Sequence, residues 1–255
     1  MLNELQERID NLTYYFLRQV DEIEAVNGPS PQGKALFQKI LFAILLDTLS
    51  IAANPALFDK NKERFRTFIN SCSAWQDRNR VSSPQLALDL EQRKLTDGPL
   101  YRSLSSTLKE WPQDVPLRPD VDPTIDQIAA LNYSNEEITA AKDNRYDFLL
   151  YAYRNTLLHE FREPGYGFNF PEEENVFYHS MTHASGQEGV PYSYQLSFPV
   201  SFFRRLCLSS IWGLYTLLTK ERRDPSDAYP FGSLWRPRRA RAQPSRPKMK
   251  QSKAR

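Results

Sequence analysis

The stretch from Gln32 to Ala53, QGKALFQKILFAILLDTLSIAA, decides the fold. Most of its positions are apolar, so a helix formed here has no broad polar face to turn toward water and belongs at the centre of a core. Asn54-Pro55 ends the helix, because a proline disfavours helical backbone at the residue before it. Since Lys39 and Asp47 interrupt the apolar run, we predict a buried core helix and no membrane span.

The segments on either side also carry helical patterns. Leu2 to Val26 has apolar residues spaced three or four apart, which indicates an amphipathic helix that ends at Asn27-Gly28-Pro29. Ser134 followed by Glu137 is a capping signal, and it predicts one helix that runs to about residue 162. Further helices are predicted over 60–75, 84–93, 99–111 and 200–221, with a proline-rich loop over 112–123.

Two short segments have a different pattern. Residues 175–180 and 192–198 are aromatic and alternating, and the glycines of 185–189 lie between them, which predicts a β-hairpin inserted between two helices. After residue 223, prolines replace the apolar periodicity, which is typical of an unstructured tail. We therefore predict an all-α domain over 1–223 with a hairpin at about 175–198, followed by a disordered basic tail over 224–255.

The composition excludes several common classes of protein. The sequence has neither the G-x-G-x-x-G nor the G-x-x-x-x-G-K-[ST] pattern of phosphate-binding loops. This excludes the commonest classes of dehydrogenase and ATPase, which depend on those loops. Cys72 and Cys207 are far apart and form no C-x-x-C pair, which favours two reduced, buried thiols and a cytoplasmic compartment. The polar, helix-forming N-terminus predicts no signal peptide.

The net charge of +2 hides an asymmetry between the body and the tail. Residues 236–255 contain nine Lys or Arg and no acid, which leaves 24 basic against 31 acidic residues in the rest of the chain. Such a tail fits sequence-independent binding of a phosphate backbone. A docking arm for an acidic partner and a solvated terminus remain alternatives.

The sequence Arg154-Asn-Thr-Leu-Leu-His159 carries the strongest chemical signal. Asn155 and His159 are four residues apart on the predicted helix, so the amide can orient the imidazole. Arg154 falls at the edge of the apolar sector, where an unpaired guanidinium is costly. Either an internal carboxylate satisfies it, or the anion arrives as a ligand.

A histidine beside an arginine can cleave RNA without a metal ion. The histidine takes a proton from the ribose 2′-hydroxyl or gives one to the leaving 5′-oxygen, and the arginine stabilises the charge that develops on the phosphate. One histidine does only half of this acid–base work. A symmetric dimer would supply the second.

The stretch from Tyr153 to Gly165, YRNTLLHEFREPG, resembles the R-x(4–6)-H signature of the HEPN superfamily, the higher eukaryote and prokaryote nucleotide-binding helical domains. In that family a polar residue, often Asn, follows the arginine, as Asn155 does here. The resemblance implies a helical bundle, a homodimer with a composite cleft and an endoribonuclease without metal or other cofactor. It makes Arg154 and His159 the catalytic pair and Asn155 their support. Many members are toxins or abortive-infection effectors of prokaryotic defence, so an antitoxin or regulatory partner is also implied. The hairpin and the basic tail are additions to the family pattern.

Other interpretations compete with this one. Arg154 could simply pair with a core acid while His159 is exposed, and the chain would then be a non-catalytic module that binds RNA or protein. His179 and His183, near the acids of 172–174, suggest a metal site, but a strand would separate the two rings by about 13 Å, too far to share an ion. The aromatic residues flanking the motif could stack on bases, although packing of the hairpin on the helices is their commoner use. These aromatic residues are Tyr166, Phe168, Phe170, Phe177, Tyr178, Tyr192 and Tyr194.

Overall fold

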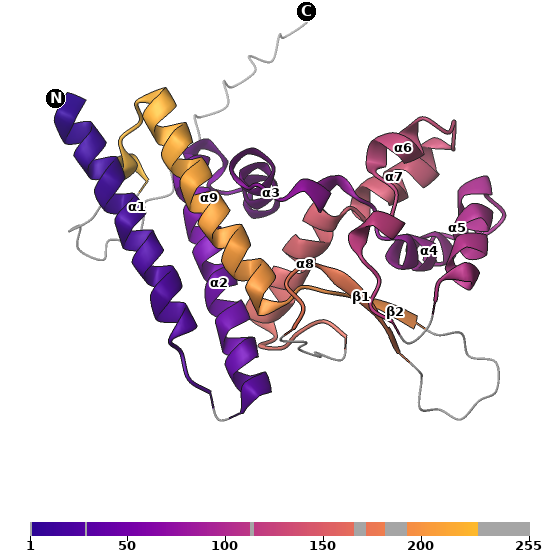
Figure 1. The fold of residues 1–255 in the computed structure, drawn as a ribbon. Helices are drawn as coiled ribbons and strands as arrows, with labels where there is room; N and C mark the ends of the chain where they lie inside the picture. Colours follow the sequence, from indigo (N-terminus) through magenta and orange to yellow (C-terminus); the bar gives the residue numbers. More distant parts are fainter. Residues whose placement is uncertain (1, 29, 113–114, 166–171, 182–192, 229–255) are drawn as a thin grey trace, which may run out of the picture.

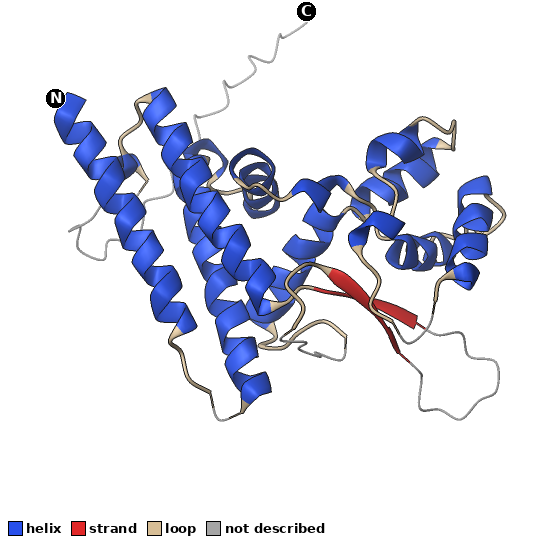
Figure 2. Ribbon diagram, in the orientation of Figure 1, coloured by secondary structure: helices blue, strands red, loops and turns tan. Residues whose placement is uncertain are grey.

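The structure is a computed structural model that describes residues 2–28, 30–112, 115–165, 172–181 and 193–228. Helices dominate these residues, and a two-stranded antiparallel sheet is inserted among them (Figure 2). The predicted all-α class with a small hairpin is therefore confirmed. The predicted turn at 185–189 and residues 229–255 of the predicted tail lie outside the described residues.

The predicted central helix is α2 (Pro31–Ala53), and it lies beside α1 (Leu2–Glu24) and α9 (Val200–Glu221) in the layer of long helices (Figure 1). Ser30 caps its N-terminus by accepting a hydrogen bond from the Gly33 amide. In the described part of the chain, α2 alone is long and apolar enough to span a membrane, and 61% of that apolar window is buried in the fold. It serves as the core helix that the sequence predicts.

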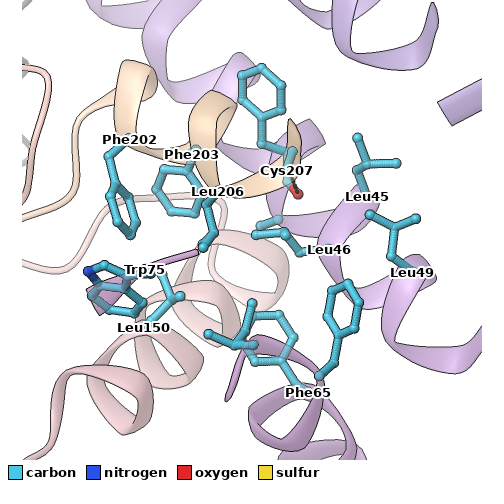
Figure 3. Close-up of a cluster of buried hydrophobic side chains, with 14 of the residues drawn as sticks. Leu45, Leu46, Leu49, Phe65, Trp75, Leu150, Phe202, Phe203, Leu206 and Cys207 are labelled. Atoms are coloured by element: carbon cyan, nitrogen blue, oxygen red, sulfur yellow. Dashed lines mark hydrogen bonds between the residues drawn. The ribbon is translucent and has the colours of Figure 1, made fainter. Parts of the chain in front are cut away.

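Helices α3 (Asn61–Cys72) and α8 (Tyr146–His159) pack against α2 and complete the main core. Leu45, Leu46 and Leu49 of α2 meet side chains from three other helices (Figure 3). These neighbours include Phe65 of α3, Leu150 of α8, and Phe203 and Leu206 of α9. Burying each such side chain contributes about 1.5–3 kcal/mol, so α2 organises most of the stabilising contacts around itself.

A second, smaller core lies among four shorter helices: α4 (Ser83–Gln92), α5 (Pro99–Glu110), α6 (Ile125–Ala129) and α7 (Asn135–Asp143). A buried polar cluster lies between the two cores. Its centre is Asp122, whose carboxylate accepts hydrogen bonds from the hydroxyls of Tyr146 and Tyr178. Burial raises the pKa of the Asp122 carboxyl, and these donors oppose that shift by stabilising the anion.

The prediction of one helix from Ser134 to about residue 162 is wrong, because the segment forms two helices, α7 and α8. The capping box of Ser134 and Glu137 is present as predicted. Asn144 then ends α7 by donating its side-chain amide to Ala140 and to Asp89 of α4. Arg145 is extended and forms a β-bridge with Val81, so the backbone there pairs with another segment instead of with its own helix.

The hairpin pairs β1 (Phe177–Met181) with β2 (Ser193–Ser197) in antiparallel register, from Phe177 opposite Ser197 to Met181 opposite Ser193. The loop before η3 (Pro119–Val121) adds a bridge from Leu117 to Tyr178. Three further short 3-10 helices are η1 (Pro55–Leu57), η2 (Gln76–Asn79) and η4 (Pro225–Asp227). The helix η4 lies within 224–255, the segment predicted as an unstructured tail. An ion pair between Asp224 and Arg8 holds the start of this segment against α1.

Gly213 of α9 provides a test of this packing. A Cβ at this position would lie 1.9 Å from the backbone carbonyl oxygen of Cys72, the last residue of α3. Alanine is favoured over glycine by up to about 1 kcal/mol in a helix, but this collision opposes it. We expect Gly213→Ala to lower the free energy of unfolding in urea by about 2 kcal/mol. Thr219→Ala, on the exposed side of the same helix, is the control, and an equally stable Gly213→Ala protein would contradict the packing.

Candidate active site on helix α8

Helix α8 carries all three predicted site residues in its last two turns. Arg154 is buried, Asn155 is half-buried, and His159 is the exposed final residue of the helix. Glu160 caps the C-terminus, and Phe161 then takes a left-handed backbone with φ of 56°, which turns the chain away. The helix thus buries the guanidinium within the fold and presents the imidazole at its end.

Arg154 is satisfied by an internal carboxylate, one of the two outcomes that the sequence left open. Its Nη2 lies 2.8 Å from Oδ2 of Asp47, which belongs to the core helix α2. The Arg154 side chain is only 9% exposed and that of Asp47 is 21% exposed. The charge-assisted bond in this partly dry site fixes the direction of the guanidinium fork.

Asp47 serves two arginines at once. Its Oδ1 lies 3.3 Å from Nη2 of Arg64, on α3, whose side chain is 3% exposed. Arg64 also donates to Ser50, to the Phe58 carbonyl and to Asn61. One carboxylate therefore faces two buried guanidinium groups, so this cluster contains one more positive charge than negative.

Asn155 pairs with Arg154 and not with His159. Its Oδ1 accepts a hydrogen bond of 2.8 Å from Nη1 of Arg154, so the amide helps to hold the arginine. We expected the amide to orient the imidazole; in this structure the adjacent guanidinium, a stronger charged donor, occupies the carboxamide oxygen instead. Any contact of Asn155 with His159 would need a different arrangement of these side chains.

His159 is the exposed last residue of α8. The C-terminal end of a helix carries partial negative charge from its unpaired carbonyl groups. The surface beside it is apolar, because the ring of Phe161 meets that of Phe37 at 5.9 Å and Phe161 is 58% exposed. The imidazole can therefore be reached from outside the chain and lies next to an apolar surface.

A buried cluster of Lys39, Tyr153 and Glu163 anchors the chain just beyond His159. Lys39 Nζ of α2 lies 2.6 Å from Oε2 of Glu163, and the side chains are 1% and 9% exposed. Tyr153 of α8 donates its hydroxyl to the same carboxylate. Burial lowers the pKa of the Lys39 ammonium, while Glu163 opposes that shift. The cluster ties the residues after α8 to the core helix.

Sequence reasoning noted Lys39 and Asp47 as charges in an apolar helix but did not find their partners. The signal was present, because a charge in such a helix must be paired or reach water. Spacing along one chain cannot name the partner, since Glu163 and Arg154 lie more than 100 residues away. Only the packing of α8 on α2 brings them together.

The other candidate residues have structural positions. His179 is buried on β1, its Nδ1 lies 3.1 Å from the Ser197 hydroxyl, and burial lowers its pKa. His183 lies outside the described residues. Glu173 and Glu174 form ion pairs with Arg118 and Arg205. Within the described ranges, no group of three or more His, Cys, Asp or Glu is placed to hold a metal.

The described members of the aromatic set that flanks the motif are buried, as are both cysteines. Phe177, Tyr178 and Tyr194 are buried, so these rings of the hairpin pack on the helices. Tyr166, Phe168, Phe170 and Tyr192 lie outside the described residues. Cys72 and Cys207 are free and buried, as predicted. Burial raises the pKa of both thiols, which makes them poor nucleophiles.

Comparisons with protein-family models, with curated proteins and with solved structures find no match to this chain. The resemblance to the HEPN signature therefore rests on the motif helix and its helical surroundings alone.

The Lys39–Glu163 pair is expected to stabilise the end of α8. Lys39→Met and Glu163→Gln should each lower the free energy of unfolding by about 3 kcal/mol, because each leaves a buried charge without its counter-ion. The double variant should lose less than the sum of the two, since it leaves no charge unpaired. Urea denaturation measures all three.

The exposed pair of Arg18 and Glu22 is the matched control for this cycle. Their side chains are 62% and 67% exposed, so Glu22→Gln should change stability by no more than about 0.5 kcal/mol. Strictly additive effects of the Lys39 and Glu163 changes would show that the buried contact is not formed.

Proposed function

We propose that this chain is a HEPN-like endoribonuclease that cleaves RNA without a metal ion. One observation carries the proposal: Asp47 and Asn155 hold Arg154 in a fixed orientation on the helix that ends in an exposed histidine, His159. An oriented guanidinium and an accessible imidazole on one helix are the groups that phosphodiester cleavage requires. The family resemblance of the motif supports the same assignment.

In the proposed reaction His159 removes the proton from a ribose 2′-hydroxyl. The 2′-oxygen attacks the adjacent phosphorus, the bond from phosphorus to the 5′-oxygen breaks, and a 2′,3′-cyclic phosphate remains on one product. Arg154 uses two of its N–H groups for Asp47 and Asn155, and its Nε is buried without a hydrogen-bond partner among the described residues. The N–H groups that remain on its two Nη atoms would stabilise the negative charge that builds on the phosphate oxygens.

The leaving 5′-oxygen needs a proton, and a second copy of the chain would supply it from its own histidine. The surface next to the motif suits this role. Phe37, Leu41 and Ile44 follow helical spacing along α2, and Ile44 is 44% exposed one turn before Asp47. Together with Phe161 they form an apolar strip beside Arg154 and His159, which a symmetric homodimer would cover.

A second candidate function follows from the Asp47–Arg154 ion pair. Since the Asp47 carboxylate already offsets the cost of burying the Arg154 guanidinium, the fold does not need a phosphate for that purpose. The chain would then be a non-catalytic helical module that binds RNA or protein. The charge surplus of two arginines on one carboxylate suits binding of an anion in both candidate functions, and the exposed His159 on the same helix favours the nuclease.

The biological setting follows from the resemblance and is proposed on that basis. Toxins and abortive-infection effectors act on RNA in the prokaryotic cytoplasm, where the two free thiols would remain reduced. A toxin of this kind requires an antitoxin or regulatory partner. RNA, a second copy of the chain and such a partner are the proposed binding partners.

Cleavage in the presence of EDTA tests the enzyme. Purified protein is incubated with mixed cellular RNA, and the products are resolved on a denaturing gel and probed for cyclic phosphate ends. The wild type should cleave, and His159→Gln and Arg154→Ala should each lose at least about 100-fold of the rate. Arg154→Ala leaves Asp47 paired with Arg64, so the fold should survive.

Arg162→Ala is the matched control, because this arginine is exposed just beyond the motif with its side chain at 58% exposure. It should cleave like the wild type. If the wild type binds RNA but cleaves none of it, the non-catalytic module is correct. Cleavage that EDTA abolishes would indicate a metal-dependent enzyme.

The homodimer has its own test. Ile44→Glu places a charge in the apolar strip without touching the core, and it should shift the solution mass from about twice 29.7 kDa to that of one chain. Cleavage should fall with it by about 10-fold or more, because the site loses the second histidine. Leu88→Glu, at a 50% exposed residue of α4, is the control. A monomeric wild type that cleaves RNA would contradict the composite site.

A further inference from the structure

A shallow, open cleft of about 450 Å³ lies between the start of α3 and the middle of α8. Tyr151 of α8 forms one side of it, and Lys60, Lys62 and Arg66 supply positive charge along the other. Asn61, Asp59 and Glu63 complete the lining. The cleft therefore combines an accessible aromatic ring with cationic side chains, the two features that single-stranded nucleic acids bind.

The positive charge in the cleft is only partly neutralised. Lys60 and Glu63 form an exposed pair at 3.2 Å, which is weak and easily exchanged for another anion. Lys62 and Arg66 lie on the same ring, that of Phe148, at 4.2 Å and 3.3 Å from its centroid. The aromatic ring holds these cations in place, and Arg66 is in addition paired with a carboxylate, that of Asp147.

The carboxylate behind the cleft is shared in the same way as Asp47. Asp147 is fully buried and accepts hydrogen bonds from both Arg66 and Arg145. Two acids, the half-buried Asp47 of α2 and the buried Asp147 of α8, thus each pair with two arginines near the face formed by α3 and α8. This face is cationic, whereas the chain outside its basic tail carries more acids than bases.

The backbone at the start of α3 adds to this charge. Lys60 occupies the N-cap position but makes no side-chain hydrogen bond to the first turn. The backbone amide groups of the first turn of α3 have no partner within the helix, and they carry the partial positive charge of the helix N-terminus, which lies at the cleft. A phosphate near Lys60 and Lys62 would receive both the ammonium and the amide donors.

Tyr151 connects the cleft to the candidate active site. The guanidinium of Arg154 lies 5.8 Å from the centre of the Tyr151 ring, one helical turn further along α8. The Tyr151 ring also packs on Phe65 at 5.7 Å, which fixes its plane. The cleft therefore lies one helical turn from Arg154, on the same helix that ends in His159.

We propose that this cleft is a binding subsite for single-stranded RNA, with a base stacked on Tyr151 and backbone phosphates on Lys60, Lys62 and Arg66. This inference rests on the proposed function and names the form of its substrate. A duplex would not fit, because its bases are already stacked and cannot reach the ring. Unpaired segments of RNA are thus the substrate class that the geometry selects.

Binding of a fluorescent single-stranded 12-mer RNA to the full chain in EDTA tests the subsite. A second set of measurements uses a strand with a 2′-deoxy residue at each position, which cannot be cleaved. Tyr151→Leu should weaken binding by about 10-fold, and Tyr151→Phe should bind like the wild type. Lys62→Gln should weaken binding several-fold and reduce the slope of log affinity against log salt by about 1. An abasic strand of equal length should not distinguish Tyr151→Leu from the wild type.

Lys142→Gln on α7 and Tyr15→Leu on α1, both at exposed positions, are the matched controls. All variants keep the basic tail, so its contribution cancels. If the cleft variants bind as tightly as the wild type, the subsite is wrong, even where cleavage depends on His159. If the cleft variants lose binding while the wild type never cleaves, the subsite stands and the nuclease fails. Equal affinity of every protein for duplex and single strand would also overturn the proposed subsite.

Discussion

The carboxylate of Asp47 is the constraint on which the arrangement of the main core depends. It lies in the most apolar helix of the chain, where an unpaired charge would cost several kcal/mol. Arg64 of α3 and Arg154 of α8 both satisfy it, so these two helices must pack on α2 at the level of one residue. The hydrophobic contacts around α2 supply the stability, and this ionic contact sets the register.

The same contact gives the candidate site its character. Asp47 and the neighbouring amide of Asn155 orient Arg154, so this arginine loses little side-chain entropy when it meets a phosphate, since its rotamer is already fixed. Sharing one acid between two arginines leaves one surplus positive charge in the cluster, and Asp147 repeats the pattern beside the cleft. Structural stability and the chemistry proposed here therefore draw on the same residues, and single substitutions will affect both.

Much of the secondary structure could be predicted from the sequence, because local signals decide it. The apolar run of α2, the capping box at Ser134 and the alternating aromatic residues of the hairpin all gave elements that the structure contains. The break between α7 and α8 was missed. It depends on the pairing of Arg145 with Val81, a contact between distant segments that no local pattern encodes.

The sequence by itself determined that this protein is helical, that α2 is its core, and that Arg154, Asn155 and His159 share one helix. Periodicity and spacing suffice for these, since they depend on neighbours along the chain. Only the tertiary structure decided that Arg154 meets Asp47, that Lys39 meets Glu163, and that Tyr151 faces the lysines of α3. Each of these contacts joins segments that are distant in the sequence, and which segments meet is fixed by how the whole core closes around α2.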